Sequence, residues 1–513
     1  MKLRIFFLTA FLVLLLNACN NEEPVISGIT EPLSTPKALS LDEVSSLNSK
    51  QGKELSENDV LKIAEDYVKD ITKQSKNFSA KTRAAVNSSS FSISSKYYLG
   101  QTQTTRSNKE SGVKSLVYEI NIDNGDDTVG RIIVSGDDRY PVVIAYIPYY
   151  RNNNKPSCNL SCDTDFMLGL SKAVYADNLN KIVSNQKEKE NTIKKIANGL
   201  SINYKNVDDK AINDYVEKYG VEKNPVEADL VNSNTRTEPS SPMEEPGSKL
   251  IRSYGKPCGT TWDQWIPYNN DYPIDWVALA EGNNPICSKD HHPAGCAVVA
   301  IAQILAALEP NGMVCNGINI NWKYLKEKKV VNGGPFGTID PSDKIEMVSA
   351  LFKDIYDETN SYPQWGKGTT DEWPPQEVNC VLQTGTTSSN VFKYFSSNSG
   401  VTAINANLSG MSKWDPEIIR KSLQYSFPVF VGGSNHAFVL DEFLYCVKKL
   451  STYELIKTYD VYFHANFGWG EGTGNGYYLV KDTQNGTITF HTGNGDFKDS
   501  DLQIIPYIGN KTL

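Results

Sequence analysis

The sequence predicts an α+β protein made of two bodies joined by a polar linker. Alternating apolar and polar residues predict antiparallel strands at 117–122 and 131–134 in the first body and around 427–441 in the second. A strongly apolar helix is expected directly after Gly295 in the second body. Between the bodies, Asn224 to Ser248 collects prolines among Asn, Ser, Thr and Glu, a composition typical of linkers.

Length and charge exclude several classes of protein. The chain has 513 residues, more than one compact core accommodates, and its 39% hydrophobic and 22% charged residues are ordinary for folded proteins. Its 51 basic and 60 acidic residues leave a net charge of -9, which repels phosphate backbones. We therefore expect no nucleic acid among its partners.

The amino terminus has the pattern of a secretory signal. Lys2 and Arg4 precede an apolar run that ends in Leu16-Asn17-Ala18-Cys19. That run spans about 18 Å as a helix, against a hydrocarbon core of roughly 30 Å, so a permanent membrane span is disfavoured. A cysteine after Leu-x-Ala resembles a bacterial lipobox, in which Cys19 is lipidated and becomes the first residue. The alternative is a plain signal peptide with an incidental cysteine.

Composition divides the chain into five segments. These are a signal peptide at 1–18, a Ser- and Pro-rich tether at 19–50, a first body at 51–222, a linker at 223–248 and a second body at 249–513. Exposed polar linkers are where proteolytic cutting concentrates. Acyl chains on Cys19 would hold the protein at a membrane without spanning it. We expect an exported envelope lipoprotein at the outer membrane or cell surface, which either stays there or is released after processing.

The first body starts with a helix and continues into strands. Ser56 is an expected N-cap, because the following apolar spacing is that of an amphipathic helix. The strands 117–122 and 131–134 flank a turn signal at 123–126, which predicts a hairpin. The aspartates of this turn lack the ligand spacing of a calcium loop. Helical spacing returns at 178–219.

One pattern in the second body points to chemistry. Cys296 follows Gly295 at the start of the apolar helix. The positive end of a helix dipole favours thiolate over thiol, and thiolate is the nucleophilic form. Gly295 permits close approach of a substrate backbone. The alternative is a small buried cysteine at the end of a core helix.

A thiolate nucleophile needs a proton partner. The chain has five histidines: His291, His292, His436, His464 and His491. His436 follows a Gly-Gly element between two β-rich runs, which predicts an imidazole at a strand start facing a cleft. His291 and His292 match no zinc spacing and are predicted to be solvated loop residues, so we expect neither a metal nor a cofactor.

A strand that runs into an aromatic and glycine turn is predicted at 462–470. Asn466 in this segment is a candidate for orienting the imidazole and holding its tautomer, with an aromatic ring shielding that bond from water. The glycines that follow lack the strand-loop-helix frame of a phosphate-binding loop.

Three motifs together carry a family resemblance. The helix Gly295-Cys-x-x-x-Ala-x-Ala-Gln303, the strand Asn435-His-Ala-Phe-Val-Leu-Asp441 and the turn Asn466-x-Gly-Trp-Gly470 occur in the order found in bacterial streptopain and interpain peptidases. The chain resembles these papain-like cysteine proteases, which are made as zymogens, from about residue 254 to 508. The resemblance implies a papain-like domain with a helical half led by the Cys296 helix and an antiparallel β half.

The resemblance also assigns roles. It implies that Cys296 is the nucleophile and that His436 is the general base and acid. Gln264 matches the oxyanion glutamine of the family, whose amide acts with the backbone N–H of Cys296. Asn466 and Trp469 match the turn that supports the histidine.

Two positions depart from the family pattern. Phe467 stands where relatives often carry tryptophan, so the shielding role is shared differently with Trp469. Asn435 precedes His436 where a glycine is common, beside a substrate subsite. With Gly295, Asn435 is our candidate for substrate binding.

The first body resembles the propeptide of the same family. Its segment Val134-Ser-Gly-Asp-Asp-Arg139 is similar to a propeptide signature. The resemblance implies that residues 51–222 form an α+β inhibitory domain, which covers the cleft and keeps the histidine away from the cysteine until it is removed. The alternative is a small β-rich binding domain.

The sequence therefore favours a secreted or envelope-anchored cysteine endopeptidase made as a zymogen. Its expected partners are protein or peptide substrates, its own propeptide as an intramolecular inhibitor, and a membrane reached through the lipid anchor. One alternative is a catalytically silent surface lipoprotein that binds proteins with a protease-like fold. Another is an acyl transferase that uses the same thiol chemistry.

Seven cysteines remain after Cys19 and Cys296 are assigned: Cys158, Cys162, Cys258, Cys287, Cys315, Cys380 and Cys446. An odd number leaves at least one free thiol unless two chains pair. Cys158 and Cys162 are a candidate local disulfide in an oxidising compartment.

Overall fold

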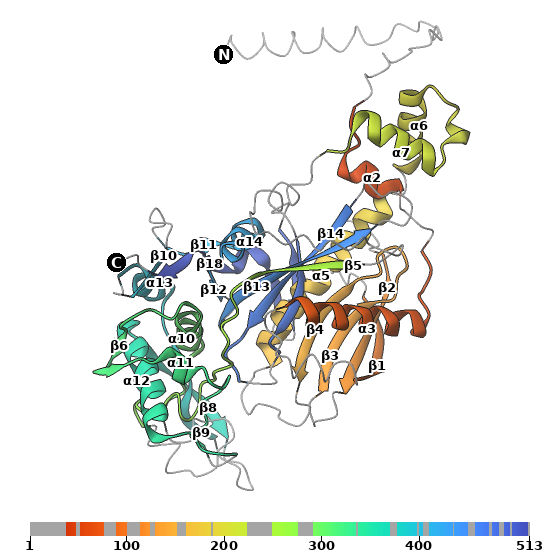
Figure 1. Ribbon diagram of the computed structural model, residues 1–513. Helices are drawn as coiled ribbons and strands as arrows, with labels where there is room; N and C mark the ends of the chain where they lie inside the picture. Colours follow the sequence, from red (N-terminus) through yellow and green to blue (C-terminus); the bar gives the residue numbers. More distant parts are fainter. Residues whose placement is uncertain are drawn as a thin grey trace, which may run out of the picture.

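The computed structural model describes most of both predicted bodies (Figure 1). The described residues are 37–47, 52–75, 89–99, 113–123, 129–150, 161–185, 188–222, 249–274, 291–334, 337–369, 377–397, 400–403, 410–433, 436–449, 457–470, 474–481, 487–492 and 495–510. The signal peptide, Cys19, most of the tether and the linker lie outside these ranges.

The N-terminal body alternates helices with a block of four strands. Its elements are α2 (Leu41–Leu47), α3 (Glu57–Gln74), β1 (Ser90–Leu99), β2 (Ser115–Asp123), β3 (Val129–Ser135), β4 (Val143–Tyr150), α5 (Ser161–Asn185), α6 (Lys189–Leu200), the short helix η1 (Tyr204–Asn206) and α7 (Asp209–Tyr219).

The C-terminal body has a helical region followed by a long run of strands. Its first elements are β5 (Lys249–Gly255), α10 (Cys296–Leu308), β6 (Val314–Cys315), β7 (Ile318–Asn319), α11 (Trp322–Leu325), α12 (Ser342–Glu358), β8 (Tyr362–Thr369), β9 (Glu377–Gly385) and α13 (Ser388–Ser397). The rest are β10 (Val401–Ala403), β11 (Ser412–Lys413), α14 (Pro416–Gln424), β12 (Val429–Gly433), β13 (His436–Lys449), β14 (Lys457–Asn466), β15 (Gly476–Val480), β16 (Thr489–Thr492), β17 (Gly495–Lys498), η2 (Asp499–Asp501), β18 (Gln503–Ile505) and β19 (Ile508–Asn510).

The predicted local elements of the N-terminal body are confirmed. Ser56 caps α3, and its side chain accepts a hydrogen bond from the Asp59 amide at 3.2 Å. The apolar face of α3, which includes Tyr67 and Ile71, is buried. Strands β2 and β3 pair antiparallel, as expected for the predicted hairpin. Among the described residues, none of the helices combines the length and the apolar character that a membrane span requires.

One antiparallel sheet runs through both bodies. Its strand order is β1-β2-β3-β4-β15-β14-β13-β12-β18-β11, and β5 pairs with β13 beside this path. The bodies meet where β4 pairs with β15, through Tyr146 opposite Tyr477 and Ala145 opposite Tyr478. The first body therefore extends the sheet of the second at its β15 edge.

Aromatic residues bury the junction between the bodies. Tyr67 on α3 packs against Tyr462 on β14, with ring centroids 5.4 Å apart. The Tyr462 hydroxyl donates to the Val143 carbonyl at 2.7 Å, and the Tyr140 hydroxyl donates to Asp460 at 2.8 Å. One hydrophobic core consequently includes residues of both bodies.

A second core surrounds α10 in the helical half of the C-terminal body. Helices α10, α12 and α13 contribute to it, together with Phe430 of β12 and with Ala437 and Val439 of β13. The helical half thus packs on the β half through the strands that flank His436. This arrangement confirms the α+β fold with a helical half and an antiparallel β half.

Candidate active site

Cys296 is the first residue of α10, as predicted. Gly295 before it has φ 91°, and a Cβ at that position would lie 2.8 Å from the Thr384 carbonyl oxygen. Only glycine tolerates this conformation and this approach of β9. Cys296 is half-buried and forms no disulfide. Because it is the first residue of α10, it lies at the positive end of the helix dipole.

Gln264 lies against the segment that leads into Cys296. Its side-chain Oε1 accepts from the Gly295 amide at 3.1 Å, and its backbone carbonyl accepts from the Ala294 amide at 2.9 Å. Its Nε2 is buried and has no hydrogen-bond partner in the described part of the chain. A buried amide donor normally finds a partner, so this Nε2 is an exception among the described residues.

His436 is the first residue of β13 and is buried. Its Nε2 donates to the Phe467 carbonyl at 3.2 Å, which leaves Nδ1 as the proton acceptor of the ring. The indole of Trp469 stacks on the imidazole, with centroids 5.4 Å apart and planes 11° apart. Phe438 and Phe467 also lie against the ring. Aromatic rings therefore enclose the imidazole, but the hydrogen bond beside them goes to the Phe467 carbonyl and not to Asn466.

Burial controls the charge of this imidazole. Desolvation lowers the pKa of His436 to about 3, and the hydrogen bond with Phe467 opposes this shift only in part. The ring is neutral near pH 7 in the full-length chain. It has the form that accepts a proton, while the charged imidazolium that results is disfavoured in this environment.

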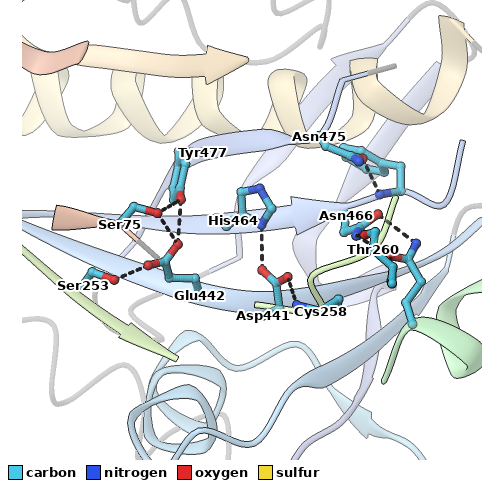
Figure 2. A network of polar contacts seen from close by, with 12 residues as sticks. Ser75, Ser253, Cys258, Thr260, Asp441, Glu442, His464, Asn466, Asn475 and Tyr477 are labelled. Atoms are coloured by element: carbon cyan, nitrogen blue, oxygen red, sulfur yellow. Dashed lines mark hydrogen bonds and ion pairs between the residues drawn. The ribbon is translucent and has the colours of Figure 1, made fainter. Parts of the chain in front are cut away.

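Asn466 is the last residue of β14, but its contacts differ from those expected. Its Nδ2 donates to the Thr260 carbonyl at 2.9 Å and to Gln303 Oε1, and its Oδ1 accepts from Gln303 Nε2 at 2.9 Å. Figure 2 shows Asn466 and Thr260 in this arrangement. The bond to the imidazole comes instead from the carbonyl of the next residue, Phe467. Asn466 therefore holds the turn rather than the ring.

The turn after β14 packs on the helix that carries the cysteine. Gly468 has φ 72°, and a Cβ there would lie 2.7 Å from the Val299 side chain, one helical turn after Cys296. Trp469, which stacks on His436, follows directly. Ala437 and Val439 of β13 lie in the same core as α10. The structure thus brings the segments of Gln264, Cys296, His436 and Trp469 to one end of α10.

Some predictions are corrected or lie outside the described residues. His292 was expected to be solvated, yet it is buried, and its ring lies edge to face with Trp365 at 6.4 Å because β8 and β9 cover the segment before α10. Asn435 lies outside the described residues. Cys258 and Cys315 form no disulfide, in line with the expectation of at least one free thiol. The candidate disulfide between Cys158 and Cys162 lies outside the described residues.

The sequence prediction missed the contacts that join these segments. Gln303 was noted only as the last residue of the helix motif and was given no role, and Thr260 and Thr384 were not singled out. Each of the three contacts a segment of the site. Gln303 carried a usable signal, because it is a polar residue in an otherwise apolar helix and is followed by more apolar residues. The roles of Thr384 and of the Phe467 carbonyl depend on backbone approach, which has no sequence signal.

The depressed pKa of His436 predicts a pH-dependent stability. In the unfolded chain the His436 imidazole has its ordinary pKa near 6.5, so below that pH the unfolded chain binds a proton that the folded chain does not bind. The free energy of unfolding therefore falls as the pH drops below 6.5. Between pH 6.5 and pH 5 this contributes a loss of about 1.5 kcal/mol. His436→Phe should remove that part of the slope in urea unfolding. Equal slopes for both chains would contradict the burial of a neutral imidazole.

The comparison with known families agrees with this geometry. Residues 262–478 match the model of the Peptidase C10 family, the streptopain family. No curated protein matches the chain. The matched segment contains Gln264, Cys296, His436 and Asn466. Residues 262–478 therefore resemble the Peptidase C10 (streptopain) family, whose fold is papain-like, and this match indicates a cysteine peptidase.

Proposed function

We propose that the chain is a cysteine endopeptidase made as a zymogen, with Cys296 as nucleophile and His436 as general base and acid. Gln264 Nε2 and the backbone N–H of Cys296 would form the oxyanion hole. The observation that carries this proposal is the buried, unpartnered amide of Gln264 beside the residues that lead into Cys296. A donor left unsatisfied at that position suits an oxyanion that appears only during reaction.

The proposed reaction uses these groups in sequence. The Cys296 sulfur attacks the peptide carbonyl carbon while its proton passes to His436 Nδ1, and the resulting oxyanion accepts hydrogen bonds from Gln264 and the Cys296 amide. As the C–N bond breaks, the imidazolium returns its proton to the leaving amine. Water then hydrolyses the thioester with His436 as base, and this restores the thiol.

Latency would come from the environment of His436. An imidazole with a pKa of about 3 resists becoming the imidazolium that the first step requires. The N-terminal body pairs with β15 and packs α3 against β5 and Tyr462. Both β5 and β14 pair with β13, the strand that begins at His436. We propose that removal of residues 51–222 relaxes this strand, so that water reaches the imidazole and its pKa rises.

The proposal includes export and anchoring. The basic residues, apolar run and Cys19 at the amino terminus support a lipoprotein precursor. A tether at 19–50 would hold the folded chain away from the membrane, and a cut at 223–248 would release the peptidase body.

Replacing Cys296 should remove activity. Under reducing conditions, Cys296→Ala is expected to hydrolyse casein at least about 10⁴-fold more slowly than the wild type, because no other group supplies the thiolate. Cys315→Ala is the matched control. Burial raises the pKa of the Cys315 thiol, which is a core residue, so its loss should leave hydrolysis intact.

Two results would contradict this assignment. Casein hydrolysis by Cys296→Ala at the wild-type rate would place the nucleophile elsewhere. A wild-type chain that cleaves no protein and whose Cys296 resists a thiol-directed epoxide would instead indicate a catalytically silent binding lipoprotein.

Gln264→Ala tests the oxyanion hole. Loss of one oxyanion donor is expected to lower kcat by about 10²–10³-fold with little change in KM, because the donor acts mainly in the transition state. Gln424→Ala, at the end of α14, removes a glutamine amide outside the site and should leave kcat unchanged. Steady-state kinetics on a peptide substrate distinguish the two. A Gln264→Ala enzyme with wild-type kcat would exclude this role.

Processing should occur in the linker. When the full-length chain is incubated under reducing conditions, amino-terminal sequencing of the active product is expected to find a new terminus within 223–248. Full-length Cys296→Ala, incubated alone, should stay uncut if the enzyme processes itself. Full activity from an intact, unprocessed chain would refute the zymogen proposal.

A further inference from the structure

Gln303 is a buried polar residue in the middle of an apolar helix. Its side chain is fully buried, and the neighbouring residues of α10 are alanine, valine, isoleucine and leucine. It follows Cys296 by seven residues, which places it two turns further on the same face of the helix. Burying an amide costs free energy unless its hydrogen bonds are made, so the partners of the Gln303 amide show which part of the structure it stabilises.

The partners of Gln303 lie in the turn that supports the histidine. Its Nε2 donates to Asn466 Oδ1 at 2.9 Å, and Asn466 Nδ2 donates back to Gln303 Oε1. The Thr260 hydroxyl donates to the same Gln303 Oε1 at 3.3 Å. Figure 2 shows this end of the polar network, with Asn466 and Thr260 labelled. The two side-chain amides are thus joined by a pair of reciprocal hydrogen bonds between α10 and the end of β14.

The turn is held on both sides of Phe467. The Gly468 amide donates to Asn466 Oδ1 at 3.3 Å, and the Phe467 amide donates to Asn475 Oδ1 at 2.8 Å. Between them, the Phe467 carbonyl accepts the His436 Nε2–H at 3.2 Å. The amide pair therefore determines where this carbonyl lies, and the carbonyl determines which ring nitrogen of His436 carries the proton.

We propose that Gln303 is a positioning residue for the reaction. It joins the turn 466–469 to α10, the helix that begins at Cys296. The Cys296 thiol and the carbonyl that orients the His436 imidazole are then held in a fixed relative position. This inference rests on the proposed function of Cys296 and His436. Without the pair, His436 loses the fixed acceptor for its Nε2–H, and the tautomer with a basic Nδ1 is populated less. The chemical step suffers, while substrate binding does not.

Gln303→Glu gives the sharpest test. The introduced carboxyl has the shape of the amide, but it has a hydrogen-bond donor only when it is protonated. When protonated, this carboxyl can donate to Asn466 Oδ1 as the amide does, whereas the ionised carboxylate has no donor and places a negative charge against that oxygen. The kcat of this variant divided by that of the wild type, measured at each pH, should be near one in acid. Above the carboxyl pKa it should fall by up to about tenfold per pH unit, until it reaches the level of a chain without the amide pair.

Two further variants complete the experiment. Gln303→Leu removes the pair at every pH, and its kcat is expected to fall about 10- to 100-fold with KM within about twofold. Ile304→Val, the next residue of the same helix, removes one buried methyl group and tests whether a loosened α10 is enough to lower kcat. Its kcat should stay within about twofold of wild type at all pH values. All chains are used at full length, activated under reducing conditions, and checked by urea unfolding.

The outcomes separate this inference from the proposed function. An active wild type with a pH-independent Gln303→Glu ratio, or a Gln303→Leu enzyme no slower than Ile304→Val, overturns the role of Gln303 alone. A wild type that cleaves no peptide overturns the proposed function and this inference with it. If Gln303→Leu does not fold, the Gln303→Glu ratio decides, since its protonated form keeps the native pair.

Discussion

Strand β13 is the constraint on which the rest of this structure depends. It begins at His436, pairs with β12 and β5 along one edge and with β14 along the other, and packs against α10. His436 pairs with Gly433 of β12, and the β14 ladder begins three residues later, at Val439 opposite Asn466, so the strand start is fixed by the ladder that follows it. The imidazole is therefore positioned by the sheet, and the helix that carries Cys296 is positioned by packing on the same strand.

The degree of burial of each group at the site determines how easily that group carries a charge. Cys296 is half-buried at a helix start, whereas burial and a neighbouring aspartate raise the pKa of the Cys258 thiol. His436 is shut in by three aromatic rings, and its pKa falls to about 3. Burial thus disfavours the protonated form of the imidazole. Under the proposed zymogen mechanism, activation requires a change in the surroundings of this ring.

A buried carboxylate connects the two bodies. Glu442 on β13 accepts from Ser75, which follows α3, at 2.8 Å and from Tyr477 on β15 at 2.6 Å, and it also accepts from Ser253 on β5 (Figure 2). Next to it, Asp441 accepts from His464 at 2.6 Å and from the Cys258 amide at 2.9 Å. A buried carboxylate requires such donors. The N-terminal body consequently contacts β13 in two ways: Ser75 donates a hydrogen bond to Glu442, and apolar residues of both bodies share one core.

Short-range sequence patterns were enough to predict the local elements and the reactive residue types. The cap at Ser56, the hairpin β2–β3, the helix start at Cys296 and the strand start at His436 arise from short-range patterns, and each of these elements is present. Three features became visible only in the folded chain: Asn466 pairs with Gln303 instead of His436, His292 is buried, and both bodies share one sheet. These depend on contacts between residues far apart in the chain, whose geometry is set by packing and by the need to satisfy buried polar groups, and no local pattern encodes them.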